Sequence, residues 1–228
     1  MGTYVHPLTG APIPSVSQVL AQLKSSWRGE KMEAAALLGT ATHALISRSL
    51  CGQYVGDADV PEGCGHAWGA FQGWAFDRDP RVVRIGDGVA SEVALTTPAN
   101  VPEELAYGGT LDLVVEAVVG GALRRILVDF KTRTARDGEL TTPDRHAMTQ
   151  LGGYAMLWDT AYPEKRLDGG MIVALGRNEP TYRETWLDWN QLELCRGEFA
   201  ALRLALSAHE KRKAVNARSR QAARKGAA

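Results

Sequence analysis

Apolar residues along the chain alternate between helix-like spacing of three to four and strand-like spacing of two. In the first half of the chain this pattern predicts a helix opening after residue 15, helices at 30–50 and 65–76, and strands at 81–85 and 90–96. A long apolar stretch follows at 107–132. The second half is predicted to form a helix from 142, strands at 171–175 and 182–189, and a closing helix from about 191. Helices, strands, helix, strands and helix in this order indicate an α/β fold with a mixed central sheet flanked by helices.

Helix starts are marked by capping residues. Ser15 and Gln18 have the spacing of a capping box. Thr142 and Pro143 predict that the later helix begins there, with proline at its first position. The aromatic residues of the 65–76 helix, Trp68, Phe71 and Trp74, fit core packing better than a platform for stacking bases.

The stretch 107–132 reads as a β-hairpin. Gly120 and Gly121 suit a two-residue turn with positive φ angles, so facing residues have numbers that sum to 241. Alternation along the strands then places one set of apolar residues on a core face. The predicted core face consists of Leu111, Leu113, Val115, Ile126, Val128 and Phe130.

The opposite face of this hairpin carries charge. Asp112 falls opposite Asp129, and Lys131 points the same way. Facing carboxylates repel each other unless a positive charge lies between them. Two carboxylates with water or phosphate suit Mg²⁺, and Lys131 could hold a water or a phosphate oxygen. The alternative is that both aspartates cap strand ends in solvent and Lys131 only neutralises them.

These residues carry a family resemblance. Asp112, followed by "DFK" at 129–131, resembles the core of the PD-(D/E)xK nucleases. The segments "GGTLD", "VDFKT", "QLGGY" with Gln150 and Tyr154, and "LGTATHAL" with His43 resemble its RecB-like branch, and "PSVSQVL" resembles phage and mitochondrial single-strand DNA exonucleases of that branch. The resemblance covers roughly residues 12 to 190. Leu111 stands where the family name has proline, and no four-cysteine set exists for the iron–sulfur cluster of Cas4-like relatives.

The resemblance implies a restriction-endonuclease-like core and roles for individual residues. It makes Asp112 and Asp129 metal ligands, with the Phe130 carbonyl as a third and His43 facing the metal. Glu92 matches an acidic position on the preceding strand and would hold a second metal or bind through water. A core histidine and a solvated glutamate are the alternatives for these last two.

Gln150 and Tyr154 share a helix face, and by the resemblance they orient Lys131 or the DNA phosphate. Gly152 and Gly153 lie between them and predict a close approach of this helix to a sheet or strand.

The implied activity is hydrolysis of phosphodiester bonds by a Mg²⁺-dependent DNA exonuclease, with Mn²⁺ as a substitute and no iron–sulfur cluster. Its substrate would be DNA that is single-stranded or has a free end, in phage or bacterial replication, recombination or repair. Two alternatives stay open. One is a catalytically silent module that binds DNA or a replication partner, and the other is an endonuclease with the same active site.

Composition limits the remaining possibilities. A chain of 228 residues with 45% hydrophobic content favours one domain, here residues 1–210, and a monomer. With 26 basic and 26 acidic residues, net charge indicates neither a nucleic-acid nor a membrane partner. No signal peptide or membrane span is predicted, and the three scattered cysteines suit reduced thiols, so we expect a cytoplasmic protein. Cys64 and His66 could form half of a zinc site, but no second pair follows.

The C-terminal tail, residues 211–228, is basic. Its cations are Lys211, Arg212, Lys213, Arg218, Arg220, Arg224 and Lys225, and it has no acidic residue. It is either a frayed, solvated helix end or a mobile arm that binds phosphates.

Overall fold

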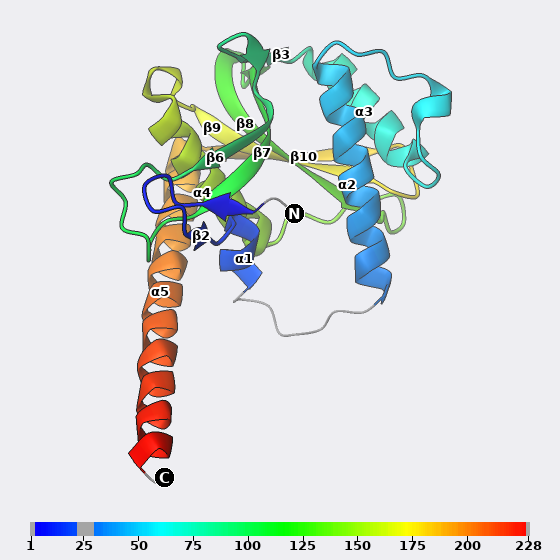
Figure 1. Ribbon diagram of the computed structural model, residues 1–228. Helices are drawn as coiled ribbons and strands as arrows, with labels where there is room; N and C mark the ends of the chain where they lie inside the picture. The colour runs from blue at the N-terminus through cyan, green and yellow to red at the C-terminus, as the bar shows by residue number, and fades with distance from the viewer. Residues whose placement is uncertain (1–2, 22–29, 227–228) are drawn as a thin grey trace.

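A six-stranded mixed sheet forms the centre of the computed structural model, which describes residues 3–21 and 30–226 (Figure 1). The strand order is β10 (Tyr182–Asp188), β9 (Gly169–Gly176), β8 (Ala122–Arg133), β7 (Gly108–Val119) and β3 (Arg81–Val82), and β6 (Ser91–Thr96) also pairs with β7. Strands β8 and β9 run parallel, while the other pairs are antiparallel. The predicted fold is confirmed: this is a mixed α/β architecture, consistent with a restriction-endonuclease-like core.

Helices cover both faces of the sheet (Figure 1). On one face α1 (Val16–Leu20), α4 (Arg145–Ala161) and the first part of α5 (Trp189–Gly226) pack on Val114 and Leu127. On the other face α2 (Glu30–Leu50) and α3 (Gly65–Arg78) pack on strand residues that include Val115 and Val128. The smaller elements are β1 (Tyr4–Val5), β2 (Pro12–Ile13), η2 (Asp57–Asp59), β4 (Arg84–Ile85), β5 (Gly88–Val89) and η3 (Pro163–Lys165).

Most predicted helices are confirmed. The Ser15–Gln18 capping box has both of its hydrogen bonds. Trp68, Phe71 and Trp74 are buried and lie against one another, as expected for core residues. The predicted start of α4, with Pro143 at the first helical position, was wrong by two residues, because α4 begins at Arg145. The Asp144 side chain accepts a hydrogen bond from the Ala147 N–H, so Asp144 is the N-cap and proline precedes the cap.

The hairpin register is confirmed where the strands remain paired. The ladder runs from Leu113–Val128 to Val119–Ala122, every pair summing to 241. Gly120 and Gly121 have φ angles of 59° and 80°, as the predicted turn requires. The predicted core face is buried, but Leu111 packs in the cluster with α4 rather than with α3. The predicted 81–85 strand divides into β3, which pairs with β7, and β4, which pairs with β5.

The close approach predicted at Gly152 and Gly153 is made to a helix, not to a sheet. A Cβ on Gly152 would lie 2.3 Å from the Cys195 carbonyl carbon, and one on Gly153 would lie 2.8 Å from the Phe199 ring. Both partners belong to α5, so the glycines let two helices pack with their backbones nearly in contact.

Further expectations concern membrane spans, the cysteines and the Cys64–His66 pair. None of the helices among residues 3–21 and 30–226 is long and apolar enough to cross a membrane. The three cysteines are free thiols. Cys64 is buried with its thiol near the Leu38 carbonyl, His66 is exposed, and the described residues include no metal-binding group at this position.

Candidate metal centre and active site

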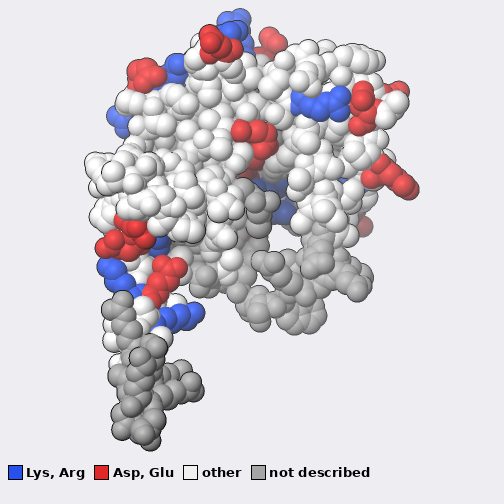
Figure 2. Space-filling view, viewed as in Figure 1, with Lys and Arg blue, Asp and Glu red and all other residues white. Residues whose placement is uncertain are grey.

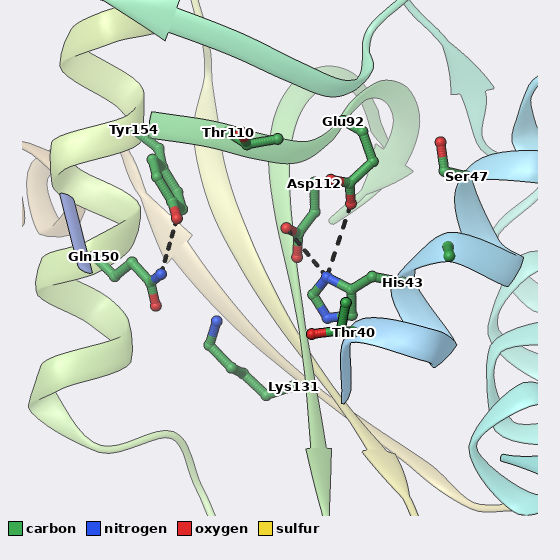
Figure 3. A pocket seen from close by; sticks show the side chains of 10 residues that line it. Thr40, His43, Ser47, Glu92, Thr110, Asp112, Lys131, Gln150 and Tyr154 are labelled. Atoms are coloured by element: carbon green, nitrogen blue, oxygen red, sulfur yellow. Dashed lines mark hydrogen bonds and ion pairs between the residues drawn. The ribbon is translucent and has the colours of Figure 1, made fainter. Parts of the chain in front are cut away.

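A cavity of about 560 Å³ lies between α2 and α4, where β6, β7 and β8 form its floor (Figure 3). It is lined by Thr40, His43, Ala44, Ser47, Glu92, Thr110, Asp112, Lys131, Gln150 and Tyr154. Six of the predicted site residues are therefore brought to one cavity: His43, Glu92, Asp112, Lys131, Gln150 and Tyr154. The seventh side chain, Asp129, lies beneath its surface, with 1% of the residue exposed.

His43 reaches this cavity from α2. Its Nε2 lies 3.0 Å from the Phe130 carbonyl oxygen. A carbonyl oxygen only accepts hydrogen bonds, so Nε2 carries a proton and donates it. Nδ1 faces Asp112 at 3.4 Å and Glu92 at 3.8 Å. In the neutral imidazole, the Nδ1 lone pair would therefore be presented to the same point as the two carboxylates.

The charge of these carboxylates affects His43. Burial lowers the pKa of the imidazole, but Asp112 raises it by more, and the result is a pKa of about 9. The metal-free imidazole is thus held protonated at neutral pH. A metal ion that bound between His43 Nδ1 and the two carboxylates would have to displace the proton on Nδ1.

Asp112 stands where β7 and β8 separate. The ladder ends at Leu113–Val128, so the predicted direct pairing of Asp112 with Asp129 is wrong. The Phe130 N–H instead donates to Asp112 Oδ2 at 2.8 Å. The carboxylate thus accepts the kind of hydrogen bond that a backbone carbonyl of β7 would accept if the ladder continued. Burial favours a higher pKa for Asp112, but the outcome is a lowered pKa, because His43, Lys131 and the Phe130 N–H all favour its charged form.

Glu92 lies in β6 directly opposite this break. Ser91 pairs with Leu113 and Val93 with Leu111, while Glu92 itself is out of the ladder with a φ of 51°. Left-handed backbone is unfavourable for a glutamate and turns its carboxylate toward the cavity. Burial, followed by the nearby Asp112, raises the pKa of Glu92. Glu92 is exposed, as the alternative of a solvated edge residue requires, but its carboxylate also lines the cavity beside His43 and Asp112.

Asp129 forms a buried ion pair with Lys131, whose Nζ lies 2.6 Å from Asp129 Oδ2. The contact lacks the angles of a hydrogen bond, and this oxygen has no hydrogen-bond donor in the described part of the chain. Burial raises the pKa of Asp129 to about 6, against the lowering effect of Lys131. The alternative that both aspartates cap strands in solvent is wrong, because neither Asp112 nor Asp129 is exposed.

Gln150 and Tyr154 form the wall that α4 contributes (Figure 3). The Gln150 amide donates to the Tyr154 hydroxyl at 2.9 Å and lies 3.4 Å from the Ser17 hydroxyl of α1. A Cβ on Gly109 would lie 2.7 Å from the Tyr154 ring. The glycine therefore lets the ring lie flat on β7, and burial raises the pKa of its hydroxyl so that it stays neutral.

Sequence reasoning missed the hydroxyl side chains of the cavity as site residues. Thr40 and Ser47 lie on α2, three residues before and four after His43, which is the spacing of one helix face. Thr110 lies two residues before Asp112 and so points to the same side of β7, where Tyr4 Oη lies 2.7 Å from its hydroxyl. These spacings relative to His43 and Asp112 could have identified the three hydroxyl residues as site residues from the sequence.

His43, Glu92 and Asp112 form a group that could hold a metal ion, because one ligand atom from each lies within 4.8 Å of the others. Two carboxylates and an imidazole are ligands for a divalent cation, with water filling the remaining positions. The Phe130 carbonyl is engaged by His43 and has a second lone pair. Asp129 is outside this group, so metal binding by Asp129 and by the Phe130 carbonyl stays a prediction.

Comparisons with known proteins give only distant similarities. Neither a protein-family model nor a curated protein matches this chain. Among solved structures, LHK-Exo in complex with dAMP is similar with a TM-score of 0.38 and 14% identity, over 90% of this chain and 94% of that one. The crystal structure of SSO0001 is similar with a TM-score of 0.35 and 15% identity, over 84% of each chain. At these TM-scores the similarity carries no argument about function.

Proposed function

We propose that this protein is a metal-dependent deoxyribonuclease that hydrolyses phosphodiester bonds with Mg²⁺, or Mn²⁺ in its place. The observation that carries the proposal is the meeting of His43, Glu92 and Asp112 within 4.8 Å in a cavity that also presents Lys131. The order of these residues along the chain, with Gln150 and Tyr154, is that of the RecB-like nucleases.

The residues divide into a metal-holding side and a phosphate-facing side. His43 Nδ1, Glu92 and Asp112 would hold the ion, with the Phe130 carbonyl and Asp129 as further ligands. When bound, the metal would polarise the phosphate and lower the pKa of a coordinated water. Lys131 would leave its contact with Asp129 to meet the growing negative charge on the phosphate. Gln150 holds the Tyr154 hydroxyl, and together they position Lys131 or a phosphate oxygen.

Asp129 and Lys131 are suited to this exchange. Asp129 has a pKa of about 6, so the cation that lies beside it strongly affects whether its carboxyl is protonated at neutral pH. If a metal ion neutralised Asp129, Lys131 would be free to turn toward the substrate without leaving a buried charge unpaired. The ion pair would then be the resting state of the catalytic lysine.

We further propose that the enzyme is an exonuclease acting on single-stranded DNA or on free ends, in phage or bacterial DNA replication, recombination or repair. A cavity of about 560 Å³, closed on one side by α4 and on the other by α2, has room for a strand end. An endonuclease would need the same chemistry on an uninterrupted strand.

The test is incubation of the purified chain with end-labelled single- and double-stranded DNA, and with circular single-stranded DNA, with and without Mg²⁺. We expect Mg²⁺-dependent loss of linear DNA, no cleavage of circles, and no activity in chelator. Asp112→Asn should abolish cleavage, and the control Asp57→Asn, at an exposed position away from the cavity, should not. Binding without cleavage in any metal would support the silent module, and cutting of circles would support the endonuclease.

A further inference from the structure

Charge is divided very unevenly along this neutral chain. Residues 211–228 contain seven of the 26 basic residues and none of the 26 acidic ones. The remaining 210 residues therefore have 19 basic and 26 acidic residues, a formal charge of −7 against +7 for the tail. A body of that charge repels a polyanion at distances up to the Debye length, about 10 Å at 0.1 M salt.

The positive segment begins where α5 leaves the body (Figure 1). Up to Ser207 the helix is held by buried contacts, such as the one from Arg203 to the Ala106 carbonyl at 3.2 Å. Beyond Ser207 none of the described side chains is buried, and residues 211–217 are all exposed. Figure 2 shows mixed charges over the body, with both basic and acidic side chains where the helix projects from it.

Residues 211–226 of α5, called the basic arm from here on, continue the helix without a break. Sixteen helical residues extend about 24 Å. That length exceeds several times the spacing of ~3.4 Å between successive phosphates along one strand of a duplex. The arm is therefore long enough to extend past several phosphates of a nucleic-acid strand.

The body neutralises little of this charge. Lys211 pairs with Glu104 of the 97–107 loop at 3.1 Å, both side chains being largely exposed. Arg212 Nη2 lies 3.3 Å from the His209 ring. Lys213 has no ion-pair partner among the described residues. Lys211 therefore pairs with an acidic residue of the body and anchors the base of the arm.

We infer that the basic arm binds the phosphates of single-stranded nucleic acid outside the cavity and so holds a long strand against the repulsion of the negative body. The inference rests on the proposed function for its choice of partner. It predicts affinity without sequence preference, because an arm that meets only phosphates reads no bases. It also predicts that the arm matters for long strands and hardly at all for short ones.

The experiment measures binding by fluorescence anisotropy, in chelator so that no cleavage occurs, with a long and a short labelled oligothymidylate over a range of KCl concentrations. The variants are a deletion of residues 212–228 and the triple change Arg218→Gln, Arg220→Gln, Arg224→Gln, since glutamine preserves helix formation. The matched control is Arg81→Gln, Arg84→Gln, Arg124→Gln, three exposed arginines of the body.

Each lost phosphate contact should reduce the slope of log affinity against log salt by about 0.7. We expect reductions of about 4 for the deletion and about 2 for the arm triple on the long strand, with little change for the body triple or on the short strand. An unchanged slope, or an equal reduction in the body triple, would overturn the inference. So would arm variants that keep full DNA binding but lose binding to vesicles containing phosphatidylserine, which would assign the arm to membranes.

Failure of this inference can be told apart from failure of the proposed function. If the deletion variant still cleaves the short oligonucleotide with Mg²⁺ and has an unchanged salt slope, the arm inference is wrong and the nuclease proposal stands. If the intact chain cleaves no DNA but removal of the arm reduces the salt slope as expected, the arm binds nucleic acid and the nuclease proposal is wrong.

Discussion

Replacing Glu92 with glycine should make the metal-free protein more stable and its metal site weaker. Glu92 has a φ of 51°, where an L side chain costs roughly 1–2 kcal/mol and glycine costs nothing comparable. The gain is offset by the conformational entropy that glycine loses on folding, about 0.5–1 kcal/mol. The net gain is then about 0.5–1 kcal/mol, which raises Tm by roughly 1–4 °C for a chain of this size.

Removing the Glu92 charge should also raise the stability of the metal-free protein. Burial, followed by Asp112, raises the pKa of Glu92, so the metal-free environment disfavours its ionised form. The Glu92 side chain is 38% exposed, and solvent screening makes this contribution the smaller one. Glu92→Gln, which removes the charge but keeps the backbone strain, should therefore change Tm less than Glu92→Gly.

The assay is thermal unfolding followed by circular dichroism, in chelator and at increasing Mg²⁺. Mg²⁺ should raise the Tm of the parent protein by mass action, as expected for a ligand bound only by the folded state, and Glu92→Gly should shrink this shift. The control is Asp137→Gly, an exposed loop residue with a φ of 53°, which should leave the Mg²⁺ shift intact. A lower Tm for Glu92→Gly in chelator, or an undiminished Mg²⁺ shift, would refute the reasoning.

Four further predictions rest on contacts in and around the cavity. Lys131→Ala should lower turnover ~100-fold or more while DNA binding survives, measured by single-turnover cleavage. In the same variant Asp129 loses its neighbouring cation, so its pKa rises further from about 6. The stability that the protonated carboxyl contributes should then be present at low pH and lost as the pH rises through this folded-state pKa. Urea unfolding that shows equal stability at pH 5 and pH 8 would contradict this. Mg²⁺ affinity should increase with pH up to about 9, at most tenfold per pH unit, because His43 must lose one proton; calorimetry should find this dependence absent in His43→Gln. Gly109→Ala should cost ~1–3 kcal/mol by pushing a methyl group into the Tyr154 ring, whereas Gly197→Ala, on an open face of α5, should stabilise the fold by ~0.5–1 kcal/mol in the same denaturation assay.

The hairpin shows how much of the candidate site the sequence could predict. Strand alternation and the Gly120–Gly121 turn were enough to place Asp112, Asp129 and Lys131 on one side of the sheet. They could not show that the strands separate at Asp112, or that His43 from α2 and Glu92 from β6 meet there, because these contacts join distant parts of the chain. The predicted facing carboxylates are instead each beside a cation, one with His43 and the other with Lys131.

Helices were predictable where a local signal decides them. The Ser15 capping box depends on residues three apart and was correct. At α4 two local signals compete, proline at the first position and aspartate as N-cap, and the aspartate hydrogen bond decided the outcome. The partner of Gly152 and Gly153 lies more than forty residues away in α5, a tertiary contact that no local pattern encodes.

Phe130 connects the hydrophobic core to the chemistry of the cavity. Its N–H is bound by Asp112 and its carbonyl by His43, while its ring packs edge-on against Phe71 and Trp74 on the far side of the sheet. A change in the size of either aromatic neighbour would shift the Phe130 backbone and, with it, the distance between the histidine and the carboxylate. Natural selection could therefore adjust the proposed activity through residues outside the cavity, and a survey of second-site suppressors should look first on α3.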